Sequence, residues 1–312
     1  MGKTAYLFPG QGAQKAGMGK DFYEHSAAAR TFFEEASEQL QMDLKTLCFT
    51  DNENLNQTAY TQPAMVTAEL AIVEAMKEAG IFCPDAAAGL SLGEYSALAA
   101  AGVLAPMDAV RAVKSRGRLM EEAVPAGVGA MAAVLGMDAA AIQAVIGEKE
   151  GVWIANDNCP GQLVITGEKK AVEEAGVLLK EAGAKRVLPL KVSGPFHSPL
   201  LEEAGEKLAE VLATCELSEL KIPYISNTLA EPVTDKTKIK ELLARQISSP
   251  VRWRESMEEL IREGVDTFIE IGPGKTISGF LKKIDRNAVV YSIQTVEDLE
   301  KTVELLKAEK EA

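Results

Sequence analysis

The sequence predicts an α/β protein in which a small domain interrupts a larger one, and three patterns carry this prediction. A strand-like run, a G-x-S-x-G motif and an Ala- and Leu-rich helix follow one another at 82–101. Strands and helices alternate as βαββαβ between 127 and 192, the ferredoxin-like order. A first strand runs into a glycine-rich loop at 4–14, where α/β folds place ligand-binding groups.

The N-terminal elements are marked by their capping residues. Ser26 is an N-cap for a helix at 27–40, and prolines open the helices that follow. In the G-x-S-x-G region, Gly102 stands where a helix C-cap belongs. The expected elements are strand 4–8, helix 27–40, helix 63–79 from Pro63, strand 82–88, helix 92–101 from Leu92, and a helix from Pro106.

The middle of the chain reads as an inserted unit between two turn-rich hinges, 125–127 and 193–195. Its expected strands are 130–135, 152–156, 162–166 and 186–191, and its expected helices are 138–146 and 170–182. This places the small domain at 125–197 and the large domain at 1–124 and 198–312.

The C-terminal part continues the alternation with a helix at 200–214, strands at 224–227 and 267–271, and a charged helix from Val296. Gly274-Lys275-Thr276 resembles the end of a Walker A loop. The first glycine of that motif would fall on Ile269, so a phosphate-cradling NTPase is not predicted.

Composition excludes several classes of function. The chain has 312 residues, of which 47% are hydrophobic and 25% charged, as in globular proteins. A formal net charge of −13 argues against nucleic-acid binding. No apolar run reaches membrane-spanning length and no signal peptide is visible, so we expect a cytoplasmic protein. Four dispersed cysteines and two histidines form no metal-binding set.

Ser91 is the candidate nucleophile, since the motif 89–93 would hold its hydroxyl on a sharp turn at the start of a helix. A serine needs a neighbouring base at neutral pH. Apart from His25, only His197 offers an imidazole, and it follows the second hinge. A structural role for a lone histidine is the alternative.

Arg116 is the second candidate, because it lies on the apolar stripe of its helix together with Val113 and Met120. A cation on an apolar face is costly unless it meets an anion. The sequence leaves two anions open: a structural carboxylate within the protein, or a carboxylate or phosphate of the substrate.

Eight segments together resemble the malonyl-CoA:acyl carrier protein transacylases, over nearly the whole chain. They are FPGQGAQ (8–14), GLSLGEYSAL (89–98), SRGRLM (115–120), NDNCPGQLVITG (156–167), GPFHS (194–198), SNTLAEPVTD (226–235), QISSPVRW (246–253) and IGPGK (271–275). The resemblance implies an α/β-hydrolase-like large domain with a parallel sheet, interrupted by the ferredoxin-like small domain.

The resemblance also implies roles for individual residues. Ser91 would be the nucleophile and His197 its general base, with Gln246 orienting the imidazole. The backbone N–H groups of Gln11 and Leu92 would form the oxyanion hole. The substrate would be bound by Arg116, which would grip the malonyl carboxylate, together with Met120, Asn156 and Phe196.

Two positions depart from the family pattern. Leu90 stands where the family often has His, and Cys159 where it usually has Ser. Leu90 removes a possible auxiliary hydrogen bond near Ser91, but it does not remove the base. Phe196 resembles the malonyl-type pattern and would crowd a 2-methyl branch.

The implied reaction moves malonyl from malonyl-CoA to the thiol of holo acyl carrier protein through an acyl-serine, in the service of fatty acid synthesis. It needs no metal and no cofactor, since the CoA thioester is a substrate, and we expect a monomer. Docking of an acidic carrier protein would need a local basic surface. Candidates are Lys185, Arg186, Lys191, Lys282 and Lys283.

Two other functions remain possible on the sequence. A serine esterase or thioesterase would share the nucleophile, but such enzymes usually carry the histidine near the C-terminus and often an HGGG loop, and this chain has neither. A non-catalytic scaffold that has kept the fold is disfavoured by the presence of Ser91, His197 and Arg116 together.

Overall fold

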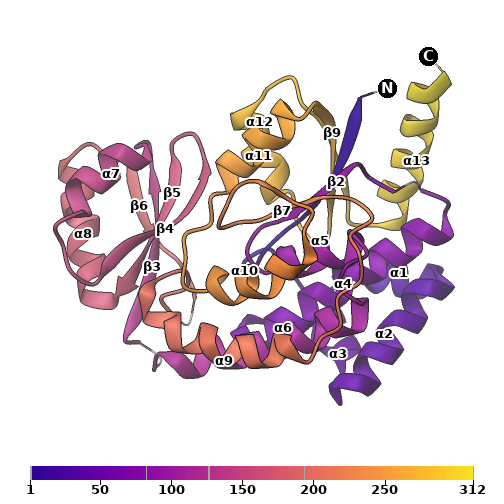
Figure 1. Cartoon of the computed structure of the whole chain (residues 1–312), viewed down its shortest axis with the longest axis horizontal. Coiled ribbons are helices and arrows are strands. Elements are labelled where there is room, and N and C mark those ends of the chain that lie inside the picture. The colour runs from indigo at the N-terminus through magenta and orange to yellow at the C-terminus, as the bar shows by residue number, and fades with distance from the viewer. Residues whose placement is uncertain (1, 82, 126, 193, 312) are drawn as a thin grey trace.

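The computed structural model describes residues 2–81, 83–125, 127–192 and 194–311, with side chains as far as 308. It contains two separate sheets, which lie in two lobes (Figure 1). The larger sheet has the order β10-β9-β1-β2-β7-β8, and all of its pairs are parallel except β7 with β8. Its strands are β1 (Lys3–Phe8), β2 (Ala86–Gly89), β7 (Tyr224–Ile225), β8 (Pro232–Val233), β9 (Val265–Ile271) and β10 (Val289–Ile293).

The smaller sheet is antiparallel and has the order β4-β5-β3-β6. Its strands are β3 (Gly129–Leu135), β4 (Val152–Cys159), β5 (Gln162–Glu168) and β6 (Arg186–Pro189), with helices α7 (Ala139–Ile146) and α8 (Lys169–Glu181) after the first and third. Both helices pack against this sheet around their own hydrophobic core. The α/β class and the βαββαβ order predicted from the sequence are confirmed.

The remaining helices belong to the larger lobe. They are α1 (Lys20–His25), α2 (Ala27–Leu40), α3 (Leu44–Phe49), η1 (Glu53–Asn56), α4 (Thr58–Glu78), α5 (Gly93–Ala100), α6 (Pro106–Ala123), η2 (Pro199–Leu201), α9 (Glu202–Ala213), η3 (Lys236–Lys238), α10 (Ile239–Gln246), α11 (Trp253–Arg262), α12 (Thr276–Ile284) and α13 (Val296–Glu311). None of the helices described is both long enough and apolar enough to cross a membrane.

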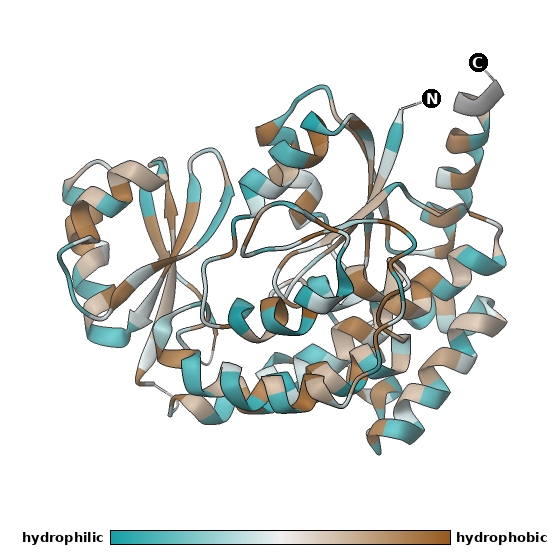
Figure 2. Ribbon diagram, in the orientation of Figure 1, coloured by the Kyte–Doolittle hydropathy of each residue, from teal (hydrophilic) through white to brown (hydrophobic). Residues whose placement is uncertain are grey.

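Strand β1 divides the core of the larger lobe into two layers, since its successive side chains point to opposite faces of the sheet. Tyr6 and Phe8 pack into the core formed with α2, α4, α5 and α6, whereas Ala5 and Leu7 pack into the core formed with α11 and α12. The residues 5–8 of β1 are therefore buried on both faces of the sheet, as a central parallel strand requires. Helix α9, at the surface, shows hydrophilic and hydrophobic residues in turn along its ribbon (Figure 2).

Helix α4 begins five residues before the predicted start, so the prediction that Pro63 opens this helix was wrong. Pro63 lies inside the helix, where its ring removes one backbone hydrogen bond. The first turn of α4 is stabilised by one contact with α6 and by local side-chain contacts with the segment that precedes the helix. The N–H of Ala59 donates to the Glu121 carboxylate on α6, and Thr61 Oγ1 donates to the carbonyls of Leu55 and Gln57.

The two lobes are joined by contacts as well as by the chain. Asn156 of β4 forms a bridge with Val251, and Arg254 donates two hydrogen bonds to Asp157 Oδ2 at 2.8 and 3.0 Å. Of the predicted hinges and the strand at 82–88, Phe82, Ala126 and Ser193 lie outside the described residues. The domain boundaries predicted from the sequence stay a prediction.

Candidate active site

Ser91 stands on a sharp turn between β2 and α5 at the carboxyl edge of the parallel sheet. Its φ is 52°, in the left-handed region that non-glycine residues seldom adopt. The two glycines of the motif allow this turn, because a Cβ on Gly89 would lie 1.9 Å from the carbonyl carbon of Gly93. A Cβ on Gly93 would lie 2.3 Å from the carbonyl oxygen of Phe8 at the end of β1. Close packing of the backbone around Ser91 thus requires glycine at both positions of the motif.

His197 comes from the chain that returns from the smaller lobe, and it too has a left-handed backbone, with φ of 60°. Its Nε2 lies 2.7 Å from Ser91 Oγ. Its Nδ1 lies 3.0 Å from the carbonyl oxygen of Gln246 and 3.1 Å from that of Ser249. Carbonyls only accept, so Nδ1 carries the proton and Nε2 accepts from the serine hydroxyl. The imidazole is therefore in the tautomer that a general base needs.

The charge state of His197 follows from its surroundings. Burial and, to a lesser degree, the nearby Arg116 guanidinium lower the pKa of His197 to about 4, although its two carbonyl contacts act in the opposite direction. At neutral pH the imidazole is neutral and able to take a proton.

This environment predicts an unusual pH dependence for the reactivity of Ser91. We expect labelling of Ser91 by an uncharged fluorophosphonate to keep its rate from pH 8 down to about pH 5, because protonation of His197 removes the base only near its pKa of about 4. The measurement is the labelling rate against pH, with circular dichroism at each pH to verify folding. A fall in rate centred near pH 6.5, the ordinary value for histidine, would contradict the buried state of the imidazole.

Arg116 of α6 is buried, with 1% of its surface exposed, and it points at the pair. Its Nη2 donates to Ser91 Oγ at 3.1 Å and to Gln246 Oε1 at 3.0 Å. Its Nε finds no acceptor among the described residues. Burial lowers the pKa of Arg116, as expected for a cation that no carboxylate contacts directly. The structural ion pair considered from the sequence is not observed in the described residues.

A cleft of about 470 Å³ opens over Ser91, between the two lobes. Its walls include apolar side chains of the smaller lobe, Met131, Val164 and Leu190, and those of α12, Ile277 and Phe280. The cleft is also lined by seven of the residues singled out from the sequence: Gln11, Ser91, Arg116, Met120, Asn156, Phe196 and His197. The fold thus brings these residues together around the Ser91 hydroxyl.

The two predicted oxyanion donors differ in their exposure. Gln11 follows β1 and lines the cleft, and its side chain donates to Thr58 Oγ1 at 3.0 Å. Leu92 is completely buried and immediately precedes α5, where backbone N–H groups lack helical partners. No acceptor among the described residues is recorded for either backbone N–H. Their role as an oxyanion hole stays a prediction.

Gln246 lies beneath the cleft and is completely buried. It contacts the site in two ways, through the main-chain carbonyl that accepts from His197 and through the side-chain amide. That amide nitrogen donates to the Ser91 carbonyl at 2.7 Å, while its oxygen accepts from Arg116. The residue therefore touches all three of Ser91, Arg116 and His197.

Two residues of the site were not singled out from the sequence. Asn227 follows β7, accepts from the Ser91 N–H at 2.6 Å and donates to the Gly89 carbonyl at 2.7 Å. Glu94, in the first turn of α5, accepts from Gln246 Nε2 at 2.7 Å. Both lie in segments that carry the family resemblance, 226–235 and 89–98, but their contacts arise from residues over a hundred positions apart.

The two residues that depart from the family pattern, Leu90 and Cys159, occupy different positions in the structure. Leu90 lines the cleft and packs against the core beneath α11 and α12, so it adds apolar surface beside Ser91. Cys159, at the end of β4, is completely buried in the same core. Of the predicted docking cations, Lys191 lines the cleft, whereas Lys283 Nζ donates to Gln162 at 3.2 Å.

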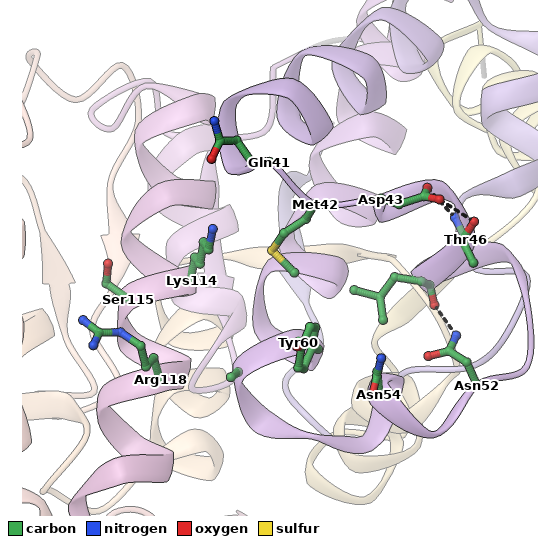
Figure 3. A pocket seen from close by; sticks show the side chains of 12 residues that line it. Gln41, Met42, Asp43, Thr46, Asn52, Asn54, Tyr60, Lys114, Ser115 and Arg118 are labelled. Carbon is green, nitrogen blue, oxygen red and sulfur yellow. Dashed lines mark hydrogen bonds between the residues drawn. The ribbon is translucent and has the colours of Figure 1, made fainter.

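A second hollow of about 620 Å³ lies outside the site, among α3, η1, the start of α4 and α6 (Figure 3). Lys114, Ser115 and Arg118 line one side of it, and Met42 and Tyr60 the other. Lys114 Nζ donates to the Leu40 carbonyl, and Asp43 caps α3 through Thr46. Neither Ser91 nor His197 reaches this hollow.

Comparison with known proteins agrees with this geometry. The model of the acyl transferase domain family matches residues 5–301. A malonyl CoA-acyl carrier protein transacylase of Bacillus subtilis (strain 168) is 52% identical, over 99% of each chain.

Solved structures give the same result. The crystal structure of a malonyl CoA-acyl carrier protein transacylase from Clostridium perfringens superposes with a TM-score of 0.94 at 43% identity, over 99% of this chain and 98% of that one. A structure of a type II PKS acyl-carrier protein in complex with its malonyl-transacylase superposes with a TM-score of 0.94 at 41% identity, over 97% of this chain and 99% of that one. The resemblance found in the sequence is confirmed.

Proposed function

The chain belongs to the acyl transferase domain family, and we propose that it is a malonyl-CoA:acyl carrier protein transacylase that works through a malonyl-Ser91 intermediate. The observation that carries the proposal is the 2.7 Å contact between Ser91 Oγ and His197 Nε2, with the buried Arg116 guanidinium 3.1 Å from the same oxygen. A nucleophile, its base and a cation thus meet at one point.

Acylation begins when His197 Nε2 takes the proton of the Ser91 hydroxyl as the oxygen attacks the thioester carbonyl. The oxyanion would be held by the backbone N–H groups of Gln11 and Leu92, each donor being worth roughly 10²- to 10³-fold in rate. Collapse of the intermediate expels the CoA thiolate, which receives the proton from His197. This leaves a malonyl ester on Ser91.

The position of Arg116 supports a substrate with a short acidic acyl group. In a malonyl ester, two carbon atoms separate the serine oxygen from the free carboxylate. The guanidinium of Arg116 already contacts that serine oxygen, and its Nε has no acceptor among the described residues. A carboxylate at this distance would therefore pair with a cation that is buried and held in place by Gln246. Phe196 and Met120 bound the remaining space.

In the second half of the reaction, the phosphopantetheine thiol of the carrier protein attacks the malonyl ester and His197 repeats its role. Transfer between two thioesters is nearly neutral in energy, so the apolar cleft walls would protect the ester from water. These steps use only groups of one chain and the two thioesters, and we propose a monomer that needs no metal or cofactor. The four cysteines are unpaired, which supports a reducing compartment such as the cytoplasm.

The proposal is tested by the mass of the intact protein. After mixing with malonyl-CoA we expect one added malonyl group, which disappears when holo acyl carrier protein is added and reappears on the carrier. The control is the apo carrier protein, which lacks the thiol and should leave the adduct in place. Loss of the adduct to water, with no malonyl on the carrier, would favour the esterase alternative.

A further inference from the structure

Glu94 is the group in the site whose presence the proposed mechanism does not explain. It stands in the first turn of α5, three residues after Ser91, and none of its surface is exposed. No cation among the described residues contacts its carboxylate directly. Burial raises the pKa of Glu94 to about 7. A carboxylate in such a place is costly, so the contacts that it makes need a reason.

One oxygen of this carboxylate makes those contacts. Glu94 Oε2 accepts from the side-chain amide of Gln246 at 2.7 Å and from the backbone N–H of Asn227 at 3.3 Å. The other oxygen, Oε1, has no partner among the described residues. Glu94 thus joins two residues from distant parts of the chain, one at the end of α10 and one after β7.

The same two residues hold the peptide groups on either side of Ser91. Gln246 Nε2 donates to the Ser91 carbonyl at 2.7 Å, and Asn227 Oδ1 accepts from the Ser91 N–H at 2.6 Å. Ser91 needs this support because its φ of 52° is unfavourable for a residue with a side chain. The strained turn is therefore clamped from both sides by groups that meet on Glu94.

Glu94 also helps to set how the Gln246 amide is oriented, together with the Ser91 carbonyl. Because both the carboxylate and this carbonyl accept, the amide nitrogen must face them, and the amide oxygen is then left facing Arg116 Nη2 at 3.0 Å. If the amide turned over, its nitrogen would face the guanidinium and two donors would oppose each other. Glu94 therefore contributes, through Gln246, to holding the Arg116 side chain in its direction.

We propose that Glu94 is a positioning residue of the acyl transfer reaction, which holds Gln246 and Asn227 so that the Ser91 turn and the Arg116 guanidinium keep their working geometry. In this role the position of the accepting oxygen of Glu94 matters, and the negative charge of the carboxylate does not. The part that concerns Arg116 rests on the proposed function, whereas the part that concerns Ser91 does not.

Two variants of Glu94 distinguish the effect of the position of the accepting oxygen from the effect of its charge. Glu94→Gln keeps a carbonyl oxygen at the same reach and loses the charge, whereas Glu94→Asp keeps the charge and withdraws the oxygen by one methylene. We expect Glu94→Asp to slow fluorophosphonate labelling of Ser91 by roughly 10²-fold, since a shift of about 1 Å has effects of that size, and Glu94→Gln to stay within about fivefold of the wild type.

Glu69 offers a matched control. It is equally buried, and its carboxylate accepts from Ser96 Oγ on the same helix α5. It makes no recorded contact with Ser91, His197 or Arg116. Glu69→Asp should therefore change thermal stability without slowing the labelling of the folded protein by more than about twofold. Thermal melting of all three variants shows whether each is folded at the assay temperature.

The KM values of the transfer reaction provide a second measurement. In Glu94→Asp we expect KM for malonyl-CoA to rise more than KM for acetyl-CoA, because Arg116 loses its fixed acceptor, and Glu94→Gln should restore the ratio. A wild-type enzyme that labels but does not transfer malonyl would refute the proposed function alone. Wild-type labelling in Glu94→Asp, slower labelling in Glu94→Gln than in Glu94→Asp, or an equal loss in Glu69→Asp would overturn the role of Glu94.

Discussion

Replacing Ser91 with alanine is expected to slow malonyl transfer by on the order of 10⁶-fold, the scale on which loss of a serine nucleophile acts. His197 would keep its tautomer, since Gln246 and Ser249 still accept from Nδ1. No oxygen would remain on the left-handed turn to attack the thioester. The measurement is the intact mass after exposure to malonyl-CoA, together with the rate of malonyl transfer to the carrier protein.

Ser115→Ala is a suitable control, because Ser115 lies on α6 beside Arg116 and lines the outer hollow (Figure 3). It should form the malonyl adduct as the wild type does. A malonyl adduct on Ser91→Ala would show that the acyl group is carried by another residue, and the proposed mechanism would fail.

Replacing Arg116 with alanine is expected to reduce kcat/KM for malonyl-CoA by roughly 10³-fold. This corresponds to about 4 kcal/mol, within the range for truncating one partner of a buried charge pair. Transfer of acetyl should fall by no more than about tenfold, because an acetyl group has no carboxylate and loses only the contact between Arg116 and Ser91. The measurement is kcat/KM with both donors in the same carrier-protein assay.

Arg118→Ala provides the comparison, since Arg118 lies two positions further along α6, is exposed and pairs with Glu122. The loss of Arg118 should leave kcat/KM unchanged for both malonyl-CoA and acetyl-CoA. Arg116→Lys should recover only part of the malonyl activity, because an ammonium cannot make the paired contact of a guanidinium. Equal losses of malonyl and acetyl transfer in Arg116→Ala would assign Arg116 to the structure of the site and not to the substrate.

The sequence was most informative where the structure depends on near neighbours. The G-x-S-x-G turn, the cap at Ser26 and the βαββαβ order depend on residues a few positions apart, and all are present in the structure. The predicted start of α4 was wrong because Pro63 is a local signal for the first turn of a helix. The helix begins at Thr58 instead, where its first turn contacts α6.

The candidate site divides in the same way. Arg116 drew attention because a charge on an apolar stripe is visible in the sequence. Asn227 and Glu94 did not, because an asparagine after a short strand and a glutamate in the first helical turn are ordinary at the surface. Only their burial against Ser91 and Gln246 gives them a place in the site.

By itself the sequence determined the local elements, the type of nucleophile and the cation that needs an anion. The tertiary structure alone decided which groups meet. Ser91 and His197 are 106 positions apart, and Gln246 is 155 positions from the Ser91 carbonyl to which it donates. Such contacts depend on how the chain crosses the sheet and returns from the smaller lobe. The periodic pattern of apolar side chains cannot predict that path. It indicates which face of a helix or strand is buried, but not which other element packs against that face.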